Sequence, residues 1–348
     1  MLYYDLVKVY QALESTTSRL EMADILADLF RSTDCAHIKK IVYMTQGSIV
    51  PDFCPEKLGM ADKLYVRTLL AATGANEESV RKLWAQEGDL GIITEKVFEN
   101  KRQTTLFSEP LTLDRVYDAL LKVARSEGSG SQEYKTRYLA DILHDAKPAE
   151  ARYIARIVTG RMRLGVASQT VIDSLAQAFA TKQDKAAVER AFNITSDLGL
   201  VGEVLCQKGI AGLEEMHVRV GNPLRAMLAE RLPSPEEILQ RMGGQAMFEY
   251  KYDGLRVQAH IQDGNVTLYS RRLEDLTSQF PDVVKSLKEA FTCKSAIVEG
   301  ECVPVDINTG ELLPFQEVSH RRGRKHGLTE AIEEYPVRIH LFDCLYLD

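Results

Sequence analysis

The sequence predicts a multidomain protein with an all-α N-terminal half and an α+β C-terminal half built on antiparallel sheets. The chain has 348 residues, a length that favours two domains over one. Apolar residues recur every three or four positions up to about residue 215, whereas they alternate after Pro233. Glycines and Pro223 interrupt the pattern between these regions, so we expect domains over residues 1–216 and 217–348.

The N-terminal half carries start and stop signals for helices. Ser18 and Glu21 have the spacing of a capping box ahead of an apolar stripe. Residues 61–74 end in a glycine suited to a helix C-terminus. Residues 168–180 begin with a serine suited to an N-cap and place their apolar residues on one face. We therefore expect a helical domain.

The C-terminal half carries strand signals. Alternation predicts strands over residues 247–252, 255–261, 266–272, 296–305 and 337–347. An Asp-Gly pair between the second and third of these predicts a hairpin. A single helix near residues 282–291 interrupts the strands.

Composition narrows the class of protein and leaves its partner open. The chain lacks an apolar run of roughly 18 residues, so we expect no membrane span. The net charge of −7 gives no global attraction to nucleic acid, although a local basic face can still bind it. The six cysteines are scattered without a CxxC pair, which favours reduced thiols over a disulfide framework or a zinc site.

Lys251, in the stretch EYKYDGLR, is the candidate nucleophile. On a strand, Glu249 and Asp253 would share its face, and the aromatic residues between them would face the core. Gly254 would allow a tight turn that returns Arg256 to the site. A lysine attacks only as a neutral amine, which costs roughly 4–5 kcal/mol at pH 7 unless burial or neighbouring cations lower the cost. The K-x-D-G motif alone leaves open an exposed strand with ion pairs.

Further stretches decide between these interpretations. EYKYDGLR, LYSRRLEDLTSQFPDV, AIVEGECVPVD, FQEVSHRRGRK and IHLFDCLYL resemble covalent nucleotidyltransferases, and their order resembles ATP-dependent DNA ligases of the archaeal and eukaryotic replicative type. In the N-terminal half, GDLGIITE, EGSGSQEYK, RMRLGVASQTVIDSLAQAF and PLRAMLAERL resemble the helical DNA-binding domain of that class and its junction with the adenylation domain. The resemblance implies a DNA-binding domain over residues 1–216 and the N-terminal part of an adenylation domain over residues 217–348.

The resemblance also implies a reaction that uses ATP and Mg²⁺. Lys251 attacks the α-phosphate of ATP to form lysyl-AMP, the adenylate passes to the 5′-phosphate at a nick, and the 3′-hydroxyl then displaces AMP. Glu249 matches the residue that accepts a hydrogen bond from the adenine amino group, and Phe342 matches the aromatic that stacks on adenine. Arg256 and Arg271 match positions that contact phosphates or ribose. Glu301 matches a glutamate near the ribose and the metal.

Without the resemblance, ordinary structural roles explain several of these residues. A strand phenylalanine such as Phe342 usually lies in a core. Arg271 and Arg272 could form a solvated strand end. Glu299 and Glu301 lie two positions apart, as expected either for a metal or ribose site or for an exposed strand that pairs with lysines.

Candidate contacts to DNA occur in three places. They are a Gly-Ser loop whose amides can approach phosphates, basic residues ahead of the predicted 168–180 helix, and a basic run that begins at His320. The residues are Gly128, Ser129, Gly130, Ser131, Lys135, Arg161, Arg163, Arg321, Arg322 and Arg324. A flexible loop and a solvated charge run are the alternatives.

The chain ends at Asp348, directly after the stretch that contains Phe342. The later phosphate-binding lysines and the OB-fold of the ligase class have no counterpart here, so we expect a piece of a longer ligase that adenylates itself poorly. The expected partners are nicked duplex DNA and a sliding clamp, and the expected state is a monomer. The expected location is the cytoplasm of an archaeon, associated with the nucleoid, or the nucleus of a eukaryote.

Other functional classes remain open at this stage. A DNA-binding fragment without catalysis fits the incomplete pocket. An RNA ligase or a capping guanylyltransferase shares the lysine motif but lacks the helical N-terminal stretches. An NAD-dependent ligase also uses a K-x-D-G lysine, although the N-terminal half here does not resemble that family.

Overall fold

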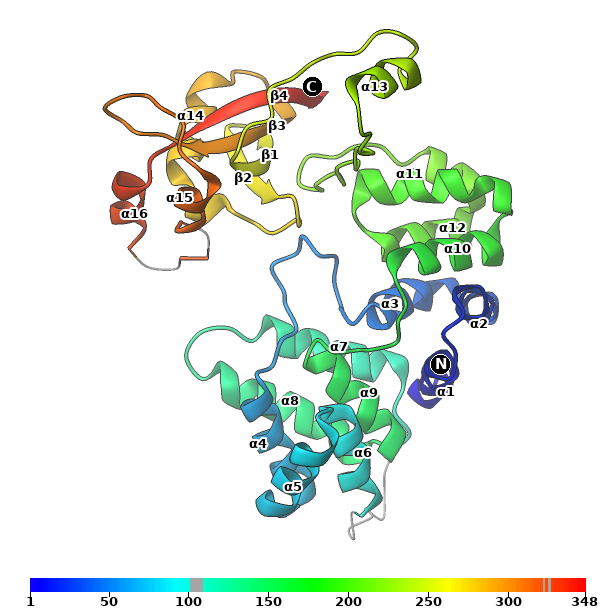
Figure 1. Ribbon diagram of the computed structural model, residues 1–348. Coiled ribbons are helices and arrows are strands. Elements are labelled where there is room, and N and C mark those ends of the chain that lie inside the picture. Colours follow the sequence, from blue (N-terminus) through cyan, green and yellow to red (C-terminus); the bar gives the residue numbers. More distant parts are fainter. Residues whose placement is uncertain (101–108, 322, 325–326) are drawn as a thin grey trace. The chain divides into compact units, whose positions relative to one another are not determined.

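The computed structural model describes residues 1–100, 109–321, 323–324 and 327–348. These residues form two compact units, one of Met1–Phe192 with Asp197–Met216 and one of Asn193–Ser196 with His217–Asp348. The first unit is helical, and the second contains a four-stranded antiparallel sheet (Figure 1). The predicted fold class is therefore confirmed. No helix among the described residues is long and apolar enough to cross a membrane.

The helical unit is built from elements of 10 to 17 residues apart from one short 3-10 turn. They are α1 (Tyr3–Glu14), α2 (Arg19–Arg31), α3 (Cys35–Thr45), α4 (Asp62–Thr73), α5 (Glu77–Glu87), α6 (Leu90–Glu99), α7 (Leu113–Arg125), α8 (Ser131–Asp145), α9 (Pro148–Val158), α10 (Ser168–Phe179), η1 (Lys182–Asp184), α11 (Lys185–Thr195) and α12 (Leu198–Glu214).

Local signals explain where several of these helices begin and end. The Ser18 side chain accepts a hydrogen bond from the backbone N–H of Glu21 at 3.4 Å, as the capping-box spacing predicts. Gly74 ends α4 in the left-handed conformation, at φ 65°. Ser168 is the first residue inside α10 and not its N-cap, which is Ala167. The Ser168 hydroxyl instead accepts a hydrogen bond from the Gln46 side chain at 3.1 Å.

A disulfide joins Cys35 at the start of α3 to Cys206 in α12. Their Cα atoms lie 5.5 Å apart although 171 positions separate them in the sequence. The expectation that all cysteines are reduced is therefore wrong for this pair. No local pattern predicts this pairing, because it depends on the packing of α12 against α3. Cys54, Cys293, Cys302 and Cys344 are free.

The second unit contains a sheet with the strand order β2-β1-β3-β4. Its elements are α13 (Pro235–Arg241), β1 (Leu255–Gln262), β2 (Asn265–Ser270), η2 (Thr277–Gln279), α14 (Pro281–Ala290), β3 (Ser295–Pro304), α15 (Phe315–Ser319), α16 (Leu328–Glu334) and β4 (Val337–Leu347). Asp263 and Gly264 join β1 to β2 with φ angles of 49° and 73°, which confirms the predicted hairpin.

The two faces of the sheet differ in chemistry. One face carries apolar residues such as Val257, Val298 and Cys302, and it packs with α14 and α15 (Figure 1). Alternation places Arg256 and Glu299 on the opposite face. This second face is polar, and the candidate nucleotide-binding residues of the strands lie there.

Candidate active site

Lys251 lies on a loop directly before β1 and not on a strand. The predicted strand over residues 247–252 is therefore wrong, and so is the inference that its aromatic residues form a core. Phe248 is 80% exposed and Tyr250 is 89% exposed. Contacts of the loop with the sheet, and not strand alternation, must fix the position of Lys251.

Three contacts fix this loop. The ring of Tyr252 stacks on His340 of β4 with the centroids 4.3 Å apart. The Asp253 carboxylate accepts a hydrogen bond from the backbone N–H of Phe315 at 3.2 Å, where α15 begins. Gly254 lies so close to β3 that an added Cβ would be 2.9 Å from Cγ of Glu301. Gly254 is thus required because a side chain would not fit at this position. Its φ is not in the left-handed region that the predicted tight turn would use.

Glu301 lies beside the lysine loop on β3, where it pairs with Arg256 of β1 and His340 of β4. Burial raises the pKa of Glu301, whereas the positive charges of Lys251 and Arg256 and a hydrogen bond from the Gly254 backbone act in the opposite direction. The half-buried carboxylate therefore interacts with the charge of Lys251. The structure brings these two predicted residues together.

Arg256 joins two further candidates. Its guanidinium forms an ion pair with Glu299, and it also lies over the ring of Phe342 at 5.3 Å from the centroid. Phe342 is 41% exposed on β4, so the ring is not a core residue in this structure. Its exposed part is available to a planar ligand, as a stacking role requires.

Arg271 follows β2 and is exposed. It lines a narrow pocket together with Arg256, Gln258 and Glu299. Pro223, Leu224 and Ala226 line the same pocket. The pocket has a volume of only about 10 Å³ and cannot hold a phosphate, but the two guanidinium groups that line it suit a contact with an anion such as a phosphate. Glu249 is exposed on the chain segment that precedes the lysine loop.

A set of polar residues around this pocket was not singled out in the sequence. Gln258 and His260 alternate along β1 and are 5% and 1% exposed. Polar residues stand at every second position of β1, from Arg256 to Gln262, and this alternation is the signal that could have revealed them. Asp253 and Tyr252 likewise hold the lysine loop, although neither was assigned a role.

The candidate metal site consists of Glu301 alone. Among the residues that the structure describes, no group of three or more His, Cys, Asp or Glu side chains is placed to hold a metal ion. Mg²⁺ commonly binds through one or two carboxylates together with substrate phosphates and water. Glu301 as a single carboxylate fits that mode, and the residues that the structure describes contain no closed protein site for a metal ion.

The Gly-Ser loop lies at the start of α8. Gly128 and Gly130 have φ angles of 80° and 81°, and the loop is exposed. Ser131 is the first residue of this 15-residue helix, and Lys135 is half-exposed one turn later. The backbone N–H groups at a helix N-terminus favour anions, so the geometry is compatible with a phosphate contact.

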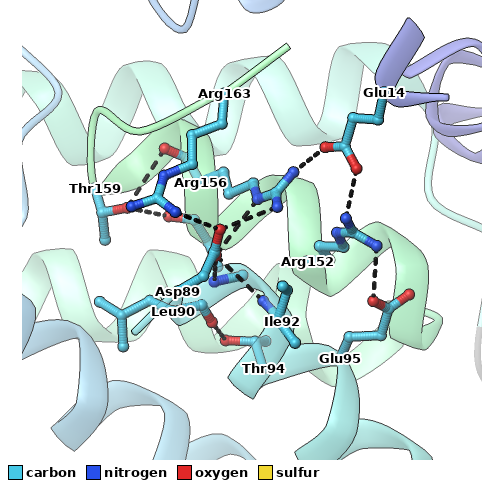
Figure 2. Close-up of polar contacts among 12 residues, drawn as sticks. Glu14, Asp89, Leu90, Ile92, Thr94, Glu95, Arg152, Arg156, Thr159 and Arg163 are labelled. Atoms are coloured by element: carbon cyan, nitrogen blue, oxygen red, sulfur yellow. Dashed lines mark hydrogen bonds and ion pairs between the residues drawn. The ribbon is translucent and has the colours of Figure 1, made fainter. Parts of the chain in front are cut away.

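Arg161 and Arg163 contact carboxylates in the structure. Arg161 pairs with Asp62 at 3.1 Å, and Arg163 pairs with Asp89 at 3.2 Å. Figure 2 shows that the Asp89 carboxylate also forms an ion pair with the guanidinium of the buried Arg156, at 3.0 Å. Arg163 remains about half exposed at an open pocket of about 590 Å³. Neither arginine is a free cation, although both reach the surface.

The basic residues that follow His320 do not form one exposed surface. Arg321 is 1% exposed, pairs with Asp282 and stacks over Phe280 at 4.5 Å. The prediction that Arg321 contacts DNA is therefore corrected, because the packing of α14 beneath it buries the charge. Arg324 is half-exposed, with its guanidinium 5.7 Å from the ring centroid of Tyr335. Arg322, together with residues 325 and 326, lies outside the described residues.

Two protein families match separate parts of the chain. Residues 2–176 match the family described as DNA ligase N terminus, and residues 226–348 match the family described as ATP dependent DNA ligase domain. The chain belongs to the ATP-dependent DNA ligase family. The family resemblance inferred from the motifs is thus confirmed.

Archaeal members of the family are similar along the whole chain. A DNA ligase 2 of Korarchaeum cryptofilum is 46% identical over 352 residues, which cover 100% of this chain and 59% of that protein. A DNA ligase 2 of Thermofilum pendens is 46% identical over 354 residues, with 99% and 59% covered. A DNA ligase of Nitrosopumilus maritimus is 41% identical over 338 residues, with 97% and 57% covered. The chain thus spans a little under three fifths of the length of these relatives.

Proposed function

We propose that the protein seals nicks in duplex DNA with ATP and that Lys251 is its nucleophile. The observation that carries the proposal is the position of the lysine loop beside Glu301, on the edge of the face that also holds Arg256, Arg271 and Phe342. A lysine, two guanidinium groups and an exposed ring in one place are what nucleotidyl transfer requires.

In the first step, the neutral amine of Lys251 attacks the α-phosphorus of ATP. A nitrogen–phosphorus bond forms, the bond to the β-phosphate oxygen breaks with its electron pair leaving on pyrophosphate, and the amine loses a proton. In-line positioning and neutralised charge matter most for such a transfer. Arg256 and Arg271 supply positive charge to the phosphates or the ribose. Mg²⁺ would offset phosphate charge, with Glu301 as one ligand.

The adenine is held by the other two candidates. Phe342 provides the stacking surface, and Glu249 accepts a hydrogen bond from the adenine amino group. A carboxylate cannot donate a hydrogen bond when ionised, so it favours an amino group over the carbonyl of guanine. In the second step the 5′-phosphate at the nick takes the adenylate, and in the third the 3′-hydroxyl displaces AMP and seals the strand.

We assign duplex binding to residues 1–216 and nucleotide binding to residues 217–348. The support for the first assignment is the exposed Gly-Ser loop with Lys135 at the start of α8, together with Arg161 and Arg163 at the surface. We assign Arg324 to the DNA surface of the second unit. None of these residues reads bases by an evident pattern, as suits an enzyme that acts at nicks of any sequence.

We further propose that the protein acts as a monomer, in the cytoplasm of an archaeon, and that a sliding clamp recruits it. The archaeal source of the similar ligases supports the proposed location. Sedimentation of the purified protein tests the monomer, and co-purification with the clamp tests the recruitment.

The test of the proposed function is nick sealing by the full-length protein. A labelled duplex with one nick should be joined only with ATP and Mg²⁺, and Lys251→Ala should abolish joining. Joining with NAD but not ATP, or joining of nicked RNA in preference to nicked DNA, would contradict the proposal.

A further inference from the structure

The strongest signal outside the assigned site is the buried amide of Gln258. Its Oε1 accepts hydrogen bonds from the backbone N–H of Leu224 at 2.7 Å and from His260 Nε2 at 2.9 Å. Its Nε2 donates to the Leu224 carbonyl at 3.2 Å and to Glu299 Oε1 at 3.0 Å. A primary amide has two donors and two acceptor sites, so every one is used.

His260 and the neighbouring backbone fix which way this amide points. Nδ1 of His260 accepts a hydrogen bond from the backbone N–H of Gly221 at 2.8 Å, so the imidazole proton lies on Nε2 and donates to Gln258. Burial lowers the pKa of His260 to about 4, which keeps the ring neutral. The Tyr269 hydroxyl donates to the Gly221 carbonyl at 3.1 Å. Residues 221–224 are therefore tied to the polar face of the sheet.

Glu299 connects the Gln258 amide to Arg256 of the candidate site. Its carboxylate is 5% exposed and has one oxygen bound to Gln258 and the other to Arg256. A buried carboxylate held at both oxygens has little freedom, so the guanidinium that it binds is also fixed. The chain of contacts runs from the Leu224 backbone through Gln258 and Glu299 to Arg256.

We propose that Gln258 is a positioning residue for Arg256: through Glu299 it fixes the guanidinium on the polar face of the sheet, and it takes its own orientation from the Leu224 backbone. This inference rests on the proposed function, because Arg256 needs an exact position only if it binds the nucleotide or the nick. A residue needed only for packing would contribute its volume alone, whereas every donor and acceptor of the Gln258 amide forms a hydrogen bond.

The test measures lysyl-AMP formation by the full-length protein, as a single-turnover rate at saturating ATP. The variants are Gln258→Met, Arg256→Ala and the double variant, with Gln262→Met as the matched control. Gln262 is an exposed glutamine at the end of the same strand. Gln258→Glu is a second variant that keeps an acceptor for the Leu224 N–H but has no donor for Glu299. Amide exchange of β1 monitors folding.

We expect Gln258→Met and Gln258→Glu to slow adenylation about tenfold, and Gln262→Met to leave it unchanged. In the Arg256→Ala background, Gln258→Met should have no further effect, because the residue it positions is gone. An equal loss in both backgrounds would mean general structural damage and would overturn the inference. An unchanged rate in Gln258→Met would overturn it as well. Absence of lysyl-AMP in the wild type would instead refute the proposed function on which it rests.

Discussion

The ring of Tyr252 stacks on His340 at 4.3 Å between centroids and 23° between planes. Tyr252 is next to Lys251 in the sequence, and His340 of β4 lies opposite Glu301 of β3. The stack therefore ties the backbone of the lysine loop to the strand beside the carboxylate. We expect this contact to set the reach of the lysine side chain.

Tyr252→Ala should accordingly slow lysyl-AMP formation by about tenfold to a hundredfold, the range expected when a reacting group is displaced by a fraction of an ångström to 1 Å. Tyr252→Phe keeps the ring and should retain nearly the full rate. Quench-flow with labelled ATP measures both. If the alanine variant adenylates at the wild-type rate, the stack does not position the loop.

The second prediction concerns acid stability. The pKa of His260 is lowered to about 4 by burial, against an ordinary value of about 6.5. The unfolded chain therefore takes up a proton between pH 6.5 and pH 4 while the folded unit does not, and the free energy of unfolding falls over this window by roughly 3 kcal/mol. A proton on Nδ1 would also point at the backbone N–H of Gly221, from which Nδ1 of the neutral ring accepts a hydrogen bond.

His260→Asn, which keeps an acceptor near the Nδ1 position, should flatten this dependence between pH 6.5 and pH 4. Amide exchange of β1 at several pH values measures the opening free energy of the second unit. The control is His144→Asn, because His144 is exposed in the helical unit. An equally steep loss of protection in His260→Asn would show that another group controls the acid response.

The third prediction concerns the ion-pair network of the helical unit. Burial disfavours the charge of Asp89, but the hydrogen bond and charge of Arg156 outweigh it and lower the pKa of the carboxyl. Asp89 also caps α6 by accepting from the N–H groups of Gly91 and Ile92. Arg156 in turn pairs with Glu14, and Arg152 joins Glu14 to Glu95 (Figure 2).

Asp89→Ala should reduce the free energy of unfolding by about 3 kcal/mol or more, because it leaves a buried guanidinium undercompensated and removes the cap. Asp89→Asn keeps the cap and should cost less. Urea unfolding followed by Trp84 reports on this unit, since Trp84 is the chain's single tryptophan. Glu77→Ala removes an exposed pair with Arg81 and should change the stability by less than about 0.5 kcal/mol. Equal losses in Asp89→Ala and Glu77→Ala would contradict the argument.

The fourth prediction concerns the disulfide between Cys35 and Cys206. It joins cysteines that lie 171 positions apart, and such a cross-link typically stabilises a fold by about 2–4 kcal/mol. Reduction should lower the thermal midpoint of the helical unit, and thiol titration of the unfolded oxidised protein should find the four free cysteines. Six titratable thiols without reductant would show that the bond does not form. Cys35→Ser should be insensitive to reductant.

The sequence predicted the secondary structure well wherever a local pattern was decisive. The Asp263–Gly264 hairpin, the Ser18 cap and the strands from residue 255 onward were of this kind. It failed at residues 247–252, where alternation of aromatic and charged residues predicted a strand but no neighbouring strand pairs with them. Periodicity records side-chain order, whereas a strand also needs a partner for its backbone.

The site was predictable only in part, for a similar reason. Motif order pointed to Arg256, Glu301 and Phe342, and the sheet brings them to one region through strand register and a ring contact. The burial of Arg321 and the pairing of Cys35 with Cys206 depend on contacts between distant segments. No local pattern encodes such contacts, so a charge run and a scattered set of cysteines gave the wrong prediction.

We expect Lys251 to carry the adenylate. After incubation of the full-length protein with ATP and Mg²⁺, mass spectrometry of the digest should find one adenylyl group on the peptide that contains Lys251. The adduct should be absent in Lys251→Ala and unchanged in Lys285→Ala, which alters an exposed lysine of the same unit. Addition of pyrophosphate should remove it. An adduct on another residue, or one that persists in Lys251→Ala, would show that Lys251 is not the nucleophile.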